Sequence, residues 1–367
     1  MAATEHVTGD GTTGKPLHRG HIGLIVALSM AAGLLLALVF AVLVVGGGTE
    51  PVVTGLVLLA FSVGWVMLAW LSTRRTEQPQ RWAYVPAVVM AALGVTHLVL
   101  RPSDDVLTAF GWVWPVPLAV LVVWMVWQSR LTLRSWSRPV ILYPVFAVLL
   151  LAAAGGVYQA IGSTTSYAMP GELVDVGGYK LHISCTGTGS PTVVLEGGLG
   201  EPAVMMAGWI QPAVAGTTKV CVYDRAGKGF SDPAPELQDG IAAAAALHTL
   251  LANAHIPGPY VLAGHSSGGP YIKVFAQQYP DQVAGMVLLD AQPSDVFAKL
   301  PGYPTIYSVF RKGTGILPSL SRLGIVRLAS TRGEAGLPPE ARAEERSDWS
   351  TAAHYRSLRD ELLELKT

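Results

Sequence analysis

Ser266 has the sequence setting most typical of chemistry in this chain. It is the middle residue of a G-x-S-x-G pattern, Gly264-His265-Ser266-Ser267-Gly268. An apolar run precedes the pattern, and a helix-compatible stretch, 271–279, follows it. A serine on a sharp strand-to-helix turn has a strained backbone, and only small residues fit two positions to either side. Such a turn exposes the hydroxyl and aims the amides at the start of the helix toward developing negative charge. The pattern therefore predicts a serine nucleophile.

Four further stretches predict the strands that would position this serine. They are a hairpin turned at Gly177-Gly178 (172–185), a strand with a glycine loop (192–200), a strand followed by a D-R-x-G-x-G-x-S turn (220–232), and a strand after a Tyr-Pro break (283–290). Together with the serine turn, their order and spacing resemble the α/β-hydrolase superfamily over about residues 172–295. The resemblance implies a mostly parallel sheet with helices on its faces.

The resemblance also implies roles for individual residues. Ser266 would be the nucleophile, and the backbone amide of Ser267 would be one oxyanion donor. The second donor would come from the glycine loop, either Leu199 or, in an alternative register, Gly198. Asp290 closes the last predicted strand and is either the catalytic acid or a structural residue that orients the following loop.

Other polar residues in this region fit structural roles better. Asp224 and Arg225 match the family's turn after the fourth strand, where hydrogen bonding to loop backbone is the expected role. Asp295 is a weaker candidate for the acid. His182 is expected to face outward from its strand, and His265 to point away from the oxyanion hole.

The chain as a whole is too apolar for a soluble protein, and the excess of apolar residues lies before residue 162. The chain has 367 residues, of which 51% are hydrophobic and only 14% charged, and its mean hydropathy is +0.42. Five runs free of Asp, Glu, Lys and Arg are long enough to cross a bilayer: 22–45, 51–72, 82–100, 106–128 and 139–158. The sequence therefore predicts five transmembrane helices, with Pro115, Pro117 and Pro144 inside spans.

Basic residues in the short loops predict the orientation of these helices. The N-terminal tail, the second loop and the fourth loop carry eight Lys and Arg residues, whereas the first and third loops carry only Arg101. By the positive-inside rule, the N-terminus is cytoplasmic and the hydrolase-like domain extracytoplasmic, in the cell membrane. Cys185 and Cys221 lie on strands that the resemblance makes neighbours, so a disulfide is expected in that oxidising setting.

The histidine of a serine hydrolase triad is not evident. None of the nine histidines lies in a loop after a last strand, and no strand-like run follows residue 290. His354 is in a charged helical stretch, 349–366, that could fold back over the site. The segment 300–328 predicts two short helices of a cap over the substrate. We expect the C-terminal part of the hydrolase fold to be missing and catalysis to be slow.

These observations predict a cytoplasmic tail (1–21), a five-helix membrane domain (22–161), an α/β-hydrolase core (162–295) and a helical cap (296–367). The expected activity is hydrolysis of an ester or related acyl bond through an acyl-serine intermediate. Its substrate would be a small-molecule or lipid-like ester at the bilayer, and no cofactor or metal is expected. The equal numbers of acidic and basic residues argue against nucleic acid as a partner. A haloperoxidase-like reaction of the same serine stays open. The alternatives of another class are a catalytically incomplete binding or scaffolding module and, less favoured, a transporter with a fused domain.

Overall fold

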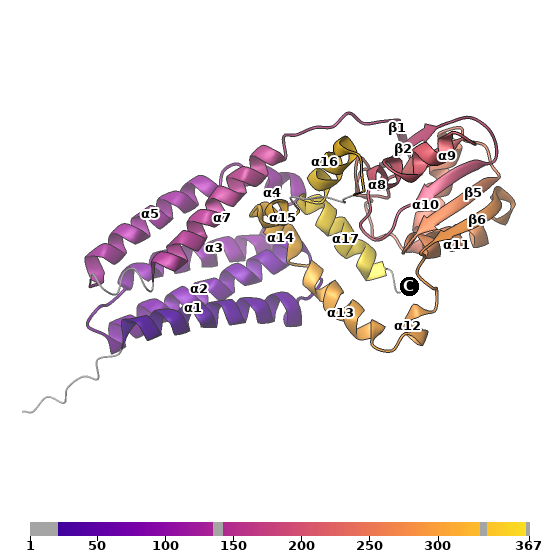
Figure 1. The fold of residues 1–367 in the computed structure, drawn as a ribbon. Coiled ribbons are helices and arrows are strands. Elements are labelled where there is room, and N and C mark those ends of the chain that lie inside the picture. Colours follow the sequence, from indigo (N-terminus) through magenta and orange to yellow (C-terminus); the bar gives the residue numbers. More distant parts are fainter. Residues whose placement is uncertain (1–20, 135–141, 331–335, 365–367) are drawn as a thin grey trace, which may run out of the picture.

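The computed structural model describes residues 21–134, 142–330 and 336–364. A bundle of long helices stands at one end of the molecule and a sheet domain at the other (Figure 1). Short C-terminal helices lie between the two.

Five helices are long and apolar enough to cross a membrane, as predicted. They are α1 (Ile22–Leu38) with its π-helical extension η1 (Val39–Val44), α2 (Glu50–Arg75), α3 (Tyr84–Leu100) with a preceding 3-10 turn η2 (Arg81–Ala83), α5 (Pro115–Thr132) and α7 (Tyr143–Gly162). Many of their large apolar side chains face outward; Leu35 is 64% exposed and Val99 is 72% exposed. Outward apolar side chains suit a hydrocarbon surrounding.

The fourth span begins later than predicted. Instead of one run over 106–128, a short helix α4 (Asp104–Gly111) is followed by a turn, and α5 starts at Pro115. Proline has no backbone N–H and fits the first turn of a helix, where that donor would have no partner. Pro144 likewise lies in the first turn of α7. The three prolines lie inside spans, as predicted, near the start of α5 and α7.

The sheet has six strands in the order β1-β2-β4-β3-β5-β6. Their bounds are β1 (Glu172–Asp175), β2 (Lys180–Thr186), β3 (Thr192–Glu196), β4 (Val220–Tyr223), β5 (Tyr260–His265) and β6 (Val283–Leu289). β1 pairs with β2 and β2 with β4 antiparallel, and the remaining pairs are parallel. All predicted strands are present, and the two glycines of the hairpin turn both have positive φ.

Apolar side chains cover both faces of this sheet. α10 (Gly240–Asn253) and α11 (Gly268–Gln278) pack on one face, where Leu250 and Phe275 are fully buried. α8 (Ala203–Ala207) and α9 (Ile210–Ala215) pack on the other face, around Met206 and Val222.

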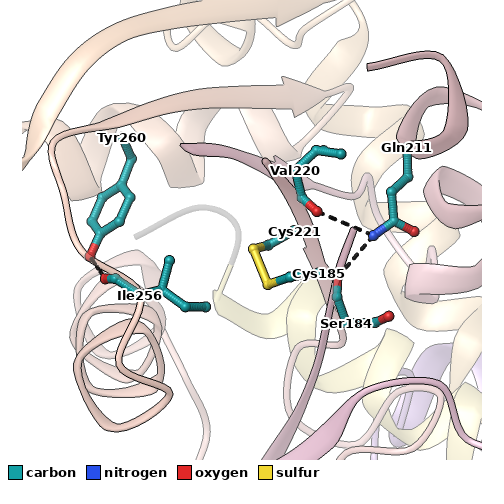
Figure 2. Close-up of a disulfide and its surroundings, with 7 residues drawn as sticks. All are labelled: Ser184, Cys185, Gln211, Val220, Cys221, Ile256 and Tyr260. Carbon is teal, nitrogen blue, oxygen red and sulfur yellow. Dashed lines mark hydrogen bonds between the residues drawn. A yellow bond between two sulfur atoms is a disulfide. The ribbon is translucent and has the colours of Figure 1, made fainter. Parts of the chain in front are cut away.

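The neighbouring strands β2 and β4 are joined by a disulfide (Figure 2). Cys185 and Cys221 are register partners, with their Cα atoms 4.0 Å apart and an S–S bond of 2.08 Å. Beside the disulfide, the Gln211 side-chain amide donates to the carbonyl of Ser184 (2.9 Å) and to that of Val220 (3.4 Å). The two strands are thus linked by a covalent bond and by the helix that covers them.

Beyond β6 the described chain is helical. Its elements are α12 (Val296–Lys299), α13 (Tyr303–Thr314), α14 (Leu317–Arg322), α15 (Ile325–Ala329), α16 (Pro339–Asp348) and α17 (Ala352–Glu364). Three helices rather than the expected two occupy 303–329, because Gly324, with a φ of +69°, turns the chain between α14 and α15. β6 pairs only with β5 in the described residues.

Four charged side chains join the C-terminal helices to the ends of the bundle. Arg322 of α14 contacts Glu50 (2.5 Å) and Asp104 (2.7 Å), which begin α2 and α4. Arg356 of α17 contacts the same two carboxylates, at 3.1 Å for Glu50. The cluster fixes α14 and α17 against the end of the bundle that faces the sheet domain.

Candidate active site

The turn between β5 and α11 places Ser266 at the edge of the sheet. Its φ is +50°, a left-handed conformation that is costly for a residue with a side chain. The Ser266 N–H donates to the carbonyl of Leu289 (3.2 Å), and its carbonyl accepts from the N–H of Gln292 (2.8 Å). These hydrogen bonds to both sides of the end of β6 stabilise the strained turn.

The two glycines of the pattern are required by close backbone contacts. A Cβ on Gly264 would lie 2.7 Å from the carbonyl atoms of Gly268. A Cβ on Gly268 would lie 2.6 Å from the carbonyl oxygen of Glu196. Side chains at either position would force β3, β5 and α11 apart, so the spacing G-x-S-x-G reflects the packing of the turn.

A cavity of about 200 Å³ adjoins Ser266. Its lining is apolar and aromatic apart from two serines and one glutamine. The lining residues are Leu199, Ser266, Ser267, Gln292, Tyr303, Ile306, Tyr307, Phe310 and Leu362. The cavity is therefore suited to the apolar part of a ligand, with the serine hydroxyl group at its wall.

Two backbone amides next to this cavity are without a partner. The Gly198 N–H donates to Glu201 Oε2 (2.6 Å), so this amide is occupied. Within the described residues, the N–H groups of Leu199 and Ser267 form no hydrogen bond, and both residues line the cavity with Ser266. Of the two registers considered for the loop donor, the geometry favours Leu199.

A buried arginine holds the glycine loop in place. The Arg225 guanidinium donates to the carbonyls of Gly197 (2.7 Å) and Gly198 (2.6 Å). It also pairs with Glu196 at the end of β3 and, through Nε (2.7 Å), with Glu361 of α17. Because the Arg225 guanidinium binds the carbonyl groups of the loop, the loop is held with Leu199 beside the cavity. Arg225 is thus in the structural role that its motif suggested.

Glu361 brings α17 into the same network. Its carboxylate contacts Lys228 Nζ (2.9 Å) and accepts from the N–H of Gly200 (3.0 Å). Burial alone would raise the pKa of Glu361, but the charges of Arg225 and Lys228 outweigh it and lower the pKa to about 2. Burial raises the pKa of Glu196, and its contact with Arg225 offsets this only in part.

His182 is not where the sequence placed it. The ring is buried, and Nδ1 lies 2.7 Å from Asp224 Oδ2, while Nε2 lies 2.5 Å from the carbonyl oxygen of Pro170. Asp224 also accepts from the N–H of Ala203 (2.6 Å). The expectation of an outward His182 was wrong, because the turn after β4 and the segment before β1 cover that side of the strand. The hydrogen bonds of Asp224 fit its predicted structural role.

Two other histidine–carboxylate pairs flank the glycine loop. His265 Nδ1 lies 2.9 Å from Glu201, the residue that binds Gly198 N–H. His354 is buried, and its Nδ1 lies 2.8 Å from Asp348 Oδ2. His354 Nε2 is 3.6 Å from the point where a Cβ on Gly200 would lie.

Sequence reasoning named both histidines but neither carboxylate partner. The only sequence feature that could have suggested either pair is the short separation of Asp348 from His354, which are six residues apart along the chain. In the described chain, no histidine forms a hydrogen bond with Ser266.

The carboxylates proposed from the sequence lie apart from these histidines. Asp290 follows β6 with a φ of +44° and is exposed, with no hydrogen bond or ion pair among the described residues. Asp295 pairs with Lys299 at 2.5 Å on the surface. The structure therefore brings together Ser266, Ser267 and Leu199, while Asp290 stands near the serine turn without a histidine.

The described residues contain no group of three or more His, Cys, Asp or Glu side chains able to hold a metal ion. Nothing in this site, as described, is arranged as a metal centre.

Comparisons with known proteins agree with the observed sheet. Residues 191–314 match the family model for the alpha/beta hydrolase fold. An uncharacterized protein of Schizosaccharomyces pombe is 30% identical over an alignment of 188 residues that covers 43% of this chain and 34% of that protein. An uncharacterized vacuolar membrane protein of Saccharomyces cerevisiae is 28% identical over 139 residues, 33% of this chain and 21% of that protein. The chain thus spans about a third or less of the length of these two relatives.

Among solved structures, the Cif epoxide hydrolase from Acinetobacter nosocomialis is similar at 16% identity and a TM-score of 0.45, covering 59% of this chain and 71% of that one. The strand order, the serine turn and the matched family model lead to one conclusion. The chain contains a domain with the alpha/beta hydrolase fold, preceded by five helices that are long and apolar enough to span a membrane.

Proposed function

We propose that this protein is a membrane-anchored serine hydrolase that cleaves an ester or related acyl bond. The observation that carries the proposal is the strained Ser266 at the wall of an apolar cavity also lined by Leu199 and Ser267, whose backbone amides have no partner among the described residues. A serine nucleophile needs such amides, because the carbonyl oxygen of the substrate becomes negatively charged when the hydroxyl attacks.

In the proposed reaction, Ser266 Oγ attacks the carbonyl carbon and its proton passes to a base. The amides of Leu199 and Ser267 donate to the oxyanion. The alcohol then leaves with a proton, and water hydrolyses the acyl-serine. His265 with Glu201 and His354 with Asp348 are the two candidate bases, since both pairs flank the glycine loop.

We further propose that the hydrolase domain is extracytoplasmic. The basic residues of the short loops support this orientation, and the disulfide between Cys185 and Cys221 is typical of an oxidising compartment.

One observation favours a second function, a catalytically incomplete binding module. Ser266 has no hydrogen bond to a histidine in the described residues, so the proton acceptor for the hydroxyl is not in place. Without a triad partner, an oxyanion hole and binding typically leave only about 10³–10⁴-fold acceleration over water.

A fluorophosphonate probe applied to the purified full-length protein in membranes separates the two functions. We expect slow labelling that Ser266→Ala abolishes and that either His265→Ala or His354→Ala slows further. His248→Ala is the matched control, because His248, on α10, stacks on Tyr279 and does not line the cavity. Labelling of the unaltered protein no greater than that of Ser266→Ala would contradict the hydrolase and support the binding module.

A further inference from the structure

The C-terminal helices α14 and α15 lie at the end of the bundle that faces the sheet domain, where α14 contacts α2 and α7 (Figure 1). The hydroxyl groups of Ser319 in α14 and Thr54 in α2 are 2.6 Å apart, and Thr54 is one helical turn, about 6 Å, inside α2. Gly155 of α7 is so close to Leu323 that an added Cβ would lie 2.3 Å from the Leu323 carbonyl oxygen. Gly155 is seven residues, about 10 Å, from the end of its helix. This part of the C-terminal region therefore contacts the spans within one to two helical turns of their ends.

The neighbouring helix α13 reaches the same level at its C-terminal end. The N–H of Gly47, just beyond the first span, donates to the carbonyl of Lys312 (3.2 Å). Arg311 and Lys312 close α13. Basic side chains at the end of a membrane span are favoured at the level of lipid headgroups.

The surface that α13 turns outward is apolar. Ile306, Val309 and Phe310, at helical spacing on α13, are 66%, 63% and 49% exposed. Large apolar side chains gathered on one face usually mark contact with a membrane or a partner. We define these three residues as the apolar face.

The apolar face is continuous with the cavity beside Ser266. Ile306 and Phe310 belong to the apolar face and also line the cavity. At about 200 Å³, the cavity is smaller than the roughly 300–1,000 Å³ that usually encloses a drug-sized ligand. A ligand with a long apolar chain would fill it and extend along α13 past Ile306 and Phe310.

From these contacts we infer that the apolar face is inserted in the leaflet on the side of the hydrolase domain, and that the cavity opens toward this leaflet. The ligand is then an amphiphilic ester of the bilayer whose acyl chain passes along α13 to Ser266. A lipid bilayer is the occupant of this face because α13, α14 and α15 contact the ends of the spans themselves. The inference on the ligand depends on the proposed hydrolase function, whereas the inference on membrane insertion does not.

Membrane insertion can be measured without any catalysis. Both natural cysteines are bonded to each other, so Val309→Cys introduces a single free thiol for a fluorescent label. In full-length protein reconstituted in phosphatidylcholine vesicles, nitroxide-bearing lipids should quench this label about as strongly as a label at Val99→Cys, near the end of α3. A label at Thr217→Cys, exposed in the turn between α9 and β4 of the sheet domain, should be unaffected.

Quenching at position 309 no greater than at position 217 would overturn the insertion. Crosslinking of two Val309→Cys chains without quenching would likewise overturn it, because the face would then be covered by a second copy. Val309 does not line the cavity, so neither result bears on the serine chemistry.

The ligand class is tested with two fluorophosphonates, one with a long alkyl chain incorporated in the vesicles and one short and water-soluble. Val309→Asp should slow labelling by the long-chain probe about tenfold, the equivalent of 1.4 kcal/mol, and leave the short probe unchanged. Thr217→Asp is the control and should affect neither. Equal effects on both probes would overturn the bilayer route. Absence of labelling by either probe, with quenching retained, would contradict the hydrolase and its ligand but not the insertion.

Discussion

The charge of Glu361 should hold α17 and the glycine loop together. In Glu361→Gln the side chain keeps its shape and can still accept from the Gly200 N–H, but the charge is lost. Arg225 and Lys228 then stay buried with one carboxylate fewer. Removal of one partner from a buried ion pair typically costs about 3–5 kcal/mol. The lowering of the Glu361 pKa from 4.5 to about 2 corresponds to about 3 kcal/mol, at the lower end of that range.

Hydrogen exchange of the peptide that covers 352–364 measures this effect locally, without assuming that the whole protein unfolds in one step. A loss of about 3 kcal/mol should accelerate exchange of its protected amides by more than about a hundredfold at pH 7. The matched control is Asp360→Asn on the same helix, since Asp360 is 35% exposed and pairs with its neighbour Arg359. We expect it to change exchange by less than about threefold.

The effect should depend on pH in a defined direction. Because the pKa of Glu361 is lower in the folded protein, its contribution is full above about pH 4.5 and is lost as the pH falls toward 2. The difference in exchange rate between the unaltered protein and Glu361→Gln should therefore shrink as the pH falls through this window. Exchange in Glu361→Gln no faster than in Asp360→Asn at pH 7 would refute the reasoning, and so would a difference that persists near pH 2.

Three further predictions concern the turn, the disulfide and the orientation. Gly268→Ala places a Cβ 2.6 Å from the carbonyl oxygen of Glu196, so it should lower the free energy of unfolding by about 1–3 kcal/mol and abolish fluorophosphonate labelling. The control is Gly285→Ala, where an added Cβ would meet no atom within 4 Å. Replacing Cys185 and Cys221 by serine should cost about 3–4 kcal/mol in urea unfolding, since the bond closes a separation of 36 residues; two alkylatable thiols in protein prepared without reductant would refute the bond. A periplasmic reporter fused at Thr165 should be active and a cytoplasmic one silent, and the reverse would refute the orientation.

Local patterns were sufficient where local geometry decides the structure. The serine turn is a property of five consecutive residues, because its glycines avoid contacts made within the turn and with the adjacent strand. The five spans follow from uncharged apolar runs, whose length alone matches a bilayer. The strands were found because each is a short apolar run bounded by turn residues.

Errors appeared where a boundary depends on the surroundings. A continuous apolar run over 106–128 does not reveal that the helix restarts at Pro115. The outward orientation of His182 assumed simple alternation along β2, which fails where other segments cover the strand. Leu199 was named from the family resemblance and not from a local pattern, because it meets Ser266 only through the pairing of β3 with β5.

The sequence by itself determined the membrane region, the hydrolase-type sheet and the serine at its turn, because each depends on residues close together along the chain. Tertiary structure alone decided how Glu361 meets Arg225, how Arg322 and Arg356 meet Glu50, and which helices form the wall of the cavity. These pairs are separated by more than a hundred residues. Their contact depends on how the C-terminal helices pack between the bundle and the sheet, and no periodicity in the sequence records that packing.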